Sequence, residues 1–189
     1  MRVPETEVDS LHGLLPGGDA IGSEYPSGWH ERLCETIADS RYPVHLVGVG
    51  NELKTDDAAG LEVASSLRAE LGACPVRGVR IHGFSPLPER LLSKLASGEG
   101  RVVIFDAVEA SAKPGEVVFR SLADTRYGFF GTHNIPLKLV PGLEERLGDF
   151  FLVGVQPASL EVGVGLSQTV REAVNEIVAV VAKGVAERA

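Results

Sequence analysis

The sequence predicts an α/β fold of three layers, in which a mostly parallel sheet lies between helices on both faces. Short apolar runs such as 44–49 and 102–105 are apolar at nearly every position, which is typical of strands buried on both faces. Segments with an apolar residue at every third or fourth position lie between these runs and predict amphipathic helices. Strands that alternate with helices are joined by crossover connections, and these favour a parallel sheet.

The segment before the first strand predicts an extension that carries one helix. Residues 1–28 are rich in Gly and Pro and show no hydrophobic period, so we expect a loosely ordered stretch. The sequence WHERLCETIADS then predicts a short helix at about 29–39, because its large apolar residues recur four positions apart. We expect this helix to cover one edge of the domain. The chain is therefore divided into an N-terminal extension, 1–43, and a domain, 44–189.

The other elements are predicted from the same two patterns, continuous apolar runs for strands and apolar residues at every third or fourth position for helices. Strands are predicted at 43–50, 76–84, 101–108, 116–120 and 149–157. The fourth of these is short and follows the turn KPGE, so we expect it at an edge of the sheet and antiparallel. Helices are predicted at 56–72, 87–97, 136–148 and 167–185. Pro141 should interrupt the third helix, and Ser167 is a suitable N-cap for the last.

Composition narrows the class of protein. The 189 residues carry a formal net charge of −8, which argues against a general nucleic-acid or anionic-membrane binder. The two cysteines, Cys34 and Cys74, form no CxxC pair, so a disulfide scaffold and a cysteine-rich zinc site are not expected. The sequence shows no signal peptide and no apolar run of transmembrane length. We therefore expect a cytoplasmic protein without membrane insertion.

Polar side chains gather where the predicted strands end, which is where ligands bind in α/β folds. These residues are Asn51, Asp56, Asp57, Asp106 and His133, the last flanked by Thr132 and Asn134. Each also has a simpler interpretation. Asp56 or Asp57 can be a helix N-cap, Asp106 can cap a loop, and His133 can be solvated. His12, His30, His45 and His82 are interpreted as structural or surface residues.

Asp57, Asp106 and His133 together offer two carboxylates and one imidazole. This set of O, O and N ligands suits a divalent metal such as zinc or nickel, and three protein ligands leave coordination positions open for chemistry. Other catalytic motifs are missing from the sequence: there is no HExxH helix, no GxSxG elbow, and no cysteine near the loops that follow the strands. The spacing itself forms no local motif, so the alternative interpretations stay open on the residues alone.

A dinucleotide site is the competing interpretation of the sequence GVGNEL. Gly48 and Gly50 match the first two glycines of GxGxxG, but Leu53 occupies the third position. The second strand ends in IHGF, without the acid that would bind a ribose. Asp56 and Asp57 would also repel a phosphate, so a cation suits this turn better.

Four sequence blocks together resemble the maturation endopeptidases of nickel-iron hydrogenases. They are GVGNELKTDDAAG, VVIFDAVEASAKPGEV, GTHNIPL and FLVGVQPASLEVGVGLSQTV, which fall in the family's order between residues 44 and about 182. GTHNIPL followed by VGVQP is most similar to the branch that serves hydrogenase 3 and formate hydrogenlyase. The resemblance implies a twisted, mostly parallel five-stranded sheet of the phosphorylase/hydrolase-like type. Residue 58 is Ala where many members have Gly, and HGFSPLPE replaces a more glycine-rich loop.

The resemblance also implies an activity and its residues. The activity is removal of a C-terminal extension from the large-subunit precursor of a hydrogenase after nickel insertion. Asp57, Asp106 and His133 match the metal-binding and catalytic residues, which bind nickel supplied by the substrate, and other divalent metals can occupy such a site in vitro. Either the metal polarises the scissile carbonyl or an aspartate acts as general base.

Residues around this set are expected to form a substrate loop: Gly50, Asn51, Asp56, Thr132 and Asn134. Gly50 and Asn51 are expected to shape the loop that presents Asp57. An alternative function uses the same three ligands. In it, a non-proteolytic nickel-checkpoint or chaperone protein binds the same precursor without cleaving it.

Overall fold

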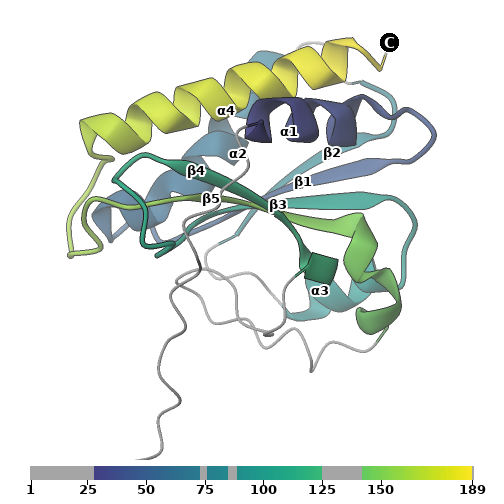
Figure 1. Ribbon diagram of the computed structural model, residues 1–189, viewed down its shortest axis with the longest axis horizontal. Helices are drawn as coiled ribbons and strands as arrows, with labels where there is room; N and C mark the ends of the chain where they lie inside the picture. The colour runs from purple at the N-terminus through teal and green to yellow at the C-terminus, as the bar shows by residue number, and fades with distance from the viewer. Residues whose placement is uncertain (1–27, 73–75, 85–88, 125–141, 189) are drawn as a thin grey trace, which may run out of the picture.

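The computed structural model describes residues 28–72, 76–84, 89–124 and 142–188. Figure 1 shows a central twisted sheet with helices above and below it. The sheet has five strands in the order β2-β1-β3-β5-β4. Their bounds are β1 Val44–Val49, β2 Val79–Phe84, β3 Arg101–Ala107, β4 Val117–Ser121 and β5 Phe150–Val155. The predicted α/β class and the five-stranded sheet are confirmed.

Four of the strands run parallel, and the fifth is antiparallel. β1 pairs with β2 and β3, and β3 pairs with β5, all in parallel. β4 pairs with β5 in the opposite direction and lies at one edge, as the short run after KPGE predicts. The carboxyl ends of the parallel strands therefore lie together along one side of the sheet, across the strand direction. This side is named the carboxyl edge, and the opposite side, where these strands begin, is named the amino edge.

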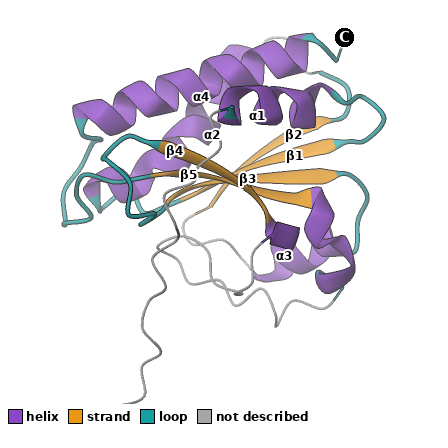
Figure 2. Ribbon diagram, in the orientation of Figure 1, coloured by secondary structure: helices purple, strands orange, loops and turns teal. Residues whose placement is uncertain are grey.

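The helices cover the two faces unequally (Figure 2). On one face lie α1 Trp29–Ala38, α2 Ala59–Leu71 and the long α4 Gln168–Ala186, which pack into the larger core with the inward residues of β1, β3 and β5. On the other face lie α3 Glu89–Ala96 and the 3₁₀ helix η4 Glu144–Asp149, with a smaller core. The predicted short helix at 29–39 is confirmed as α1, which contacts α4 and the edge strand β4.

Two of the predicted helices differ from the structure. The segment predicted as one helix from 56 begins with a 3₁₀ turn, η1 Thr55–Ala58, and α2 starts only at Ala59. In the segment predicted at 136–148, the described part forms the 3₁₀ helix η4 instead of an α-helix, and Pro141 lies outside the described residues. Both are short stretches next to a tight loop, where i to i+3 hydrogen bonds fit more easily than a full α-helical turn.

Glycines bring α2 unusually close to the sheet. A Cβ atom at Gly48 would lie 2.0 Å from the carbonyl oxygen of Gly60. A Cβ atom at Gly60 would lie 2.1 Å from the carbonyl oxygen of Phe105. Only glycine fits at either position, because a side chain would collide with backbone atoms. Gly48 therefore serves helix–strand packing in this fold, and this contact fixes the start of α2 against the ends of β1 and β3.

Candidate active site at the carboxyl edge

The turn between β1 and η1 is tightly folded. The Asn51 backbone N–H donates to the carbonyl oxygen of Asp57 at 3.2 Å, and the Asn51 side-chain oxygen accepts from the Leu53 N–H at 3.0 Å. A Cβ atom at Gly50 would lie 2.3 Å from the carbonyl oxygen of Asp57, so this position requires glycine. Gly50 and Asn51 thus shape the turn that carries Asp57.

Asp56 is a buried acceptor for a distant loop. Its carboxylate accepts hydrogen bonds from the backbone N–H of Ala158 at 2.9 Å, of Ser159 at 3.1 Å and of Ser167 at 2.6 Å. The Ser167 hydroxyl donates to it as well, at 3.0 Å. The N-cap interpretation of Asp56 is therefore wrong: α2 has Ala58 at its N-cap with no side-chain cap, and Asp56 serves residues a hundred positions away.

The prediction of Ser167 as an N-cap is correct in position but not in hydrogen bonding. It occupies the N-cap position of α4, as predicted, but no side-chain cap hydrogen bond is formed there. Its hydroxyl is directed to Asp56 instead. One buried carboxylate thus joins the start of α4 to the turn before α2, and it fixes two chain segments with a single charged group.

The loop from 156 to 167 continues this junction. The Thr55 N–H donates to the Gly163 carbonyl at 3.0 Å, and the Gly163 N–H donates to the Leu53 carbonyl at 3.0 Å. The Thr55 hydroxyl also donates to the Ser159 carbonyl at 2.8 Å. The two loops therefore form one hydrogen-bonded unit. Three large apolar side chains on this unit are exposed to solvent: Leu53, Val162 and Val164.

Two further aspartates, Asp57 and Asp106, are buried at the carboxyl edge in addition to Asp56. Each is 3% exposed, which is unusual for an aspartate. Asp57 lies in η1, which contacts β3, and Asp106 is the penultimate residue of β3. Because Gly60 packs on the carbonyl of Phe105, the start of α2 and the end of β3 are in direct contact. Both aspartates thus lie at the carboxyl edge, as the strand pattern predicts.

The third predicted ligand, His133, lies outside the described residues, together with Thr132 and Asn134. Within the described ranges, no three His, Cys, Asp or Glu side chains are grouped so as to hold a metal ion. The set of Asp57, Asp106 and His133 therefore stays a prediction. Its two described members offer carboxylate oxygens, which are suitable ligands for a divalent cation.

Gln156 is a residue that the sequence interpretation missed. Its side-chain oxygen accepts from the backbone N–H of Ala110 at 2.8 Å and of Ala112 at 3.3 Å. It lies just after β5 and so holds the loop that follows β3 and Asp106. The block VGVQP contained the signal, because a glutamine directly after an apolar strand is well placed to bind neighbouring backbone groups.

These features define an α/β protein with three buried aspartates, Asp56, Asp57 and Asp106, at the carboxyl edge of its sheet. A family model described as hydrogenase maturation protease matches residues 86–184. The hydrogenase 3 maturation protease of Escherichia coli (strain K12) is 30% identical over 136 residues, which cover 70% of this chain and 84% of that protein.

Two solved structures from Thermococcus kodakarensis are also similar. The [NiFe] hydrogenase maturation protease HycI is 25% identical, with a TM-score of 0.67, and the match covers 82% of this chain and 99% of that one. The [NiFe] hydrogenase maturation protease HybD is 30% identical, with a TM-score of 0.56, and covers 74% and 97%. The chain belongs to the hydrogenase maturation protease family and is a peptidase of that family. These relatives favour the protease over the non-proteolytic checkpoint protein.

No helix in the described ranges is both long enough and apolar enough to cross a lipid bilayer. The long helix α4 is amphipathic, with its apolar side in the larger core.

Proposed function

We propose that this chain removes the C-terminal extension of a nickel-loaded [NiFe]-hydrogenase large-subunit precursor. Family membership supports the peptidase activity, and the two buried aspartates at the carboxyl edge are the observation that supports a metal-dependent step. A relative that matches most of this chain is named for hydrogenase 3, and this supports a precursor of that type as the substrate. We also expect the enzyme to act in the cytoplasm.

In this proposal the nickel ion belongs to the substrate. Asp57, Asp106 and His133 bind the ion while the precursor's own thiolates still hold it, so only a loaded precursor completes the site. Carboxylate and imidazole ligands suit nickel, and a shared ion leaves no need for a resident metal. The fixed turn around Asn51 and Asp56 supports this role, since rigid neighbours position a metal ligand better than a mobile loop does.

The chemical step is hydrolysis of one peptide bond. Water adds to the scissile carbonyl carbon, one proton leaves the water, and the leaving amine takes up a proton when the C–N bond breaks. Two routes are compatible with the aspartates. The ion held by the substrate can polarise the carbonyl, or one aspartate can accept the proton from water as general base and return it to the amine.

The test is cleavage of purified precursor with and without nickel. We expect mass spectrometry to show a shortened large subunit only when the precursor contains nickel. A precursor that is bound and released at full length would support the checkpoint function instead. Cleavage of the metal-free precursor at an equal rate would contradict the role of nickel while leaving the peptidase assignment intact.

A further inference from the structure

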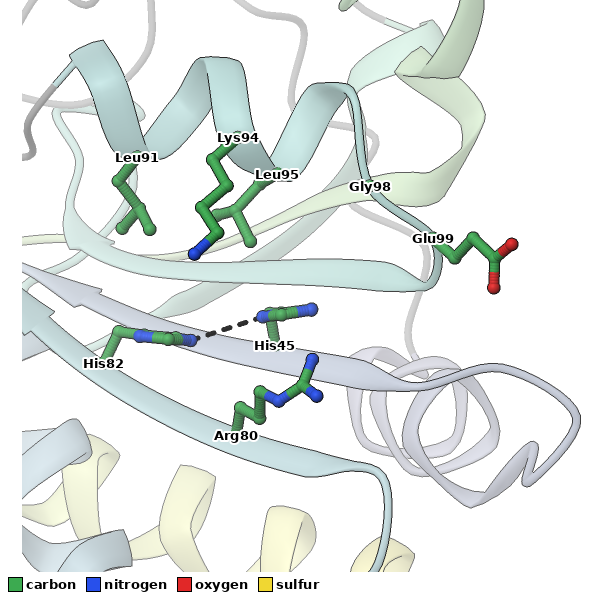
Figure 3. A pocket seen from close by; sticks show the side chains of 8 residues that line it. All are labelled: His45, Arg80, His82, Leu91, Lys94, Leu95, Gly98 and Glu99. Atoms are coloured by element: carbon green, nitrogen blue, oxygen red, sulfur yellow. Dashed lines mark hydrogen bonds between the residues drawn. The ribbon is translucent and has the colours of Figure 1, made fainter.

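A cavity lies away from the aspartates, between α3 and the β1–β2 side of the sheet (Figure 3). Its volume is about 470 Å³. The described lining residues are His45, Arg80, His82, Leu91, Lys94, Leu95, Gly98 and Glu99. We name it the histidine-pair pocket. It lies toward the amino edge, because His45 is the second residue of β1 and Gly98 and Glu99 precede β3.

Two histidines from neighbouring strands form its floor. His45 Nδ1 and His82 Nε2 are 3.2 Å apart, and the rings are stacked with centroids 5.5 Å apart. Each neutral ring carries one N–H. In the hydrogen bond between the rings, one of these two nitrogens donates its proton and the other accepts it. When His82 is the donor, His45 carries its own proton on Nε2, which is then available to a ligand. The parallel pairing of β1 and β2 produces this pair, since both side chains point to the α3 face.

The pocket lining carries more positive than negative side chains, in a chain whose net charge is −8. Arg80 and Lys94 lie exposed at its rim. Figure 3 shows Lys94 extending from α3 toward the histidines and the Arg80 guanidinium directed toward His45 from the opposite side. Glu99 is the one acid among the described lining residues, and its carboxylate points away from the pair. Leu91 and Leu95 add an apolar wall. The lining thus combines positive charge, N–H donors and an apolar surface.

Burial and positive neighbours act on both rings. Burial, followed by the positive charges of His82, Arg80, Arg146 and Lys94, lowers the pKa of His45 to about 4. Burial also lowers the pKa of His82, together with the charges of Arg68, Arg80 and Lys94. No carboxylate contributes to either shift in the described part of the chain. An anion bound in the pocket would compensate the positive charges of Arg80 and Lys94, which neither neutral histidine ring can do.

We propose that the histidine-pair pocket binds a small organic oxyanion, with its charged group between Arg80, Lys94 and the His45–His82 pair and its apolar part against Leu91 and Leu95. Phosphate monoesters and aromatic carboxylates share this chemistry. The site is separate from the aspartates, and its occupancy does not depend on the proposed proteolysis. A bound anion stabilises the imidazolium form of the pair, so binding is coupled to proton uptake and becomes tighter as the pH falls.

The test is binding to the chain alone, without precursor. Phenyl phosphate, benzoate and inorganic phosphate are titrated up to about 10 mM while NMR signals of the two imidazoles are followed, with sodium chloride at equal ionic strength as reference. We expect a saturable shift with phenyl phosphate or benzoate and a rise in the titration midpoint of the pair. Saturation by inorganic phosphate with equal affinity would identify the charged group alone as the ligand. Shifts that sodium chloride reproduces, or no saturation with any probe, would overturn the proposal.

A matched pair of variants assigns the effect to this pocket. The double variant Arg80→Gln, Lys94→Gln should weaken binding by at least about tenfold, because both charges act on the ligand at short range. Lys183→Gln removes one positive charge from the last turn of another helix, α4, and should change binding by less than about twofold. The three substituted positions are on the surface or at the rim, so circular dichroism should show an unchanged fold. Equal binding by the double variant and Lys183→Gln would refute the assignment.

Discussion

Side chains of opposite charge hold the backbone in place at the carboxyl edge and at the amino edge of the sheet. At the carboxyl edge, Asp56 accepts hydrogen bonds from the N–H groups of the loop that follows β5. At the amino edge, Arg146 donates to the carbonyl oxygens of Leu95, Gly98 and Gly100. Each charged group satisfies several backbone groups of one polarity, which a neutral side chain does less well.

The same division applies to the residues for which we propose a ligand. The carboxyl edge also holds the buried carboxylates of Asp57 and Asp106, and the amino edge holds the cationic histidine-pair pocket. Two neighbouring groups of the same charge can therefore have different roles, one that holds the fold together and one that we propose binds a ligand. Asp56 and Asp57 are adjacent in sequence, yet we assign the first to the fold and the second to the reaction.

The largest expected effect separates these two roles at the carboxyl edge. Asp57→Asn and Asp106→Asn each remove the charge of a proposed metal ligand and keep a hydrogen-bonding side chain, so the fold should persist. We expect cleavage of the nickel-loaded precursor to fall at least about 100-fold, the scale of losing one electrostatic contact in a transition state. Rates are measured by mass spectrometry of the precursor.

Asp124→Asn is the control for charge. Asp124 follows β4, whose end pairs with the start of β5 at the amino edge, far from the site. Its cleavage rate should equal that of the unmodified chain. Normal tail removal by Asp57→Asn would refute the assignment of Asp57.

Asp56→Asn should have the opposite profile, with a loss of stability as its main effect. An amide has one acceptor oxygen, so its NH₂ group would face either the Ser167 N–H or the donors of Ala158 and Ser159. We expect the free energy of unfolding to fall by about 3 kcal/mol, measured by urea denaturation. Asp124→Asn, at the exposed turn after β4, should lose much less when measured in the same way. Equal losses for the two variants would contradict the structural role of Asp56.

The strands and the position of the site were predictable because both depend on local pattern. Apolar runs identified β1, β3 and β5, and the rule for parallel sheets placed Asp57 and Asp106 at one edge. The partners of Asp56 were not predictable, since Ser167 lies 111 residues away and only the folded chain brings it near. The 3₁₀ turn η1 was missed because an aspartate pair before an apolar stripe has the same pattern as an α-helix start.

The histidine-pair pocket shows a second limit of pattern reading. His45 and His82 were interpreted as structural or surface residues, each by itself. Their contact depends on the register of two strands, in which His45 lies opposite Arg80 and His82 opposite Val47. Sequence periodicity predicts the strands but not which residues of two strands become neighbours.

Arg146→Lys tests the fastening at the amino edge. Lysine keeps the charge, but its single ammonium group cannot reach three carbonyl oxygens and the Asp149 carboxylate together. We expect a loss of about 2 kcal/mol in the free energy of unfolding by urea denaturation. Arg41→Lys is the matched control, since the Arg41 side chain is 76% exposed and its pair with Asp39 should contribute little. Similar losses in both variants would show that Arg146 has no special fastening role.

The smallest effect concerns pH at the histidine pair. Because burial and neighbouring positive charges lower the pKa of His45 from 6.5 to about 4, the unfolded chain binds a proton at a higher pH than the folded chain does. The contribution to stability is therefore complete above pH 6.5 and is lost as the pH falls toward 4. His45→Gln should flatten this part of the stability curve, measured by urea denaturation at several pH values, although it also removes the hydrogen bond to His82. That lost bond lowers the whole curve and leaves its slope unchanged, so the slope is the quantity to compare. A variant whose curve runs parallel to that of the unmodified chain would show that the acidic loss of stability arises at other groups, and the amino edge would then lack the pH response that sets it apart from the carboxyl edge.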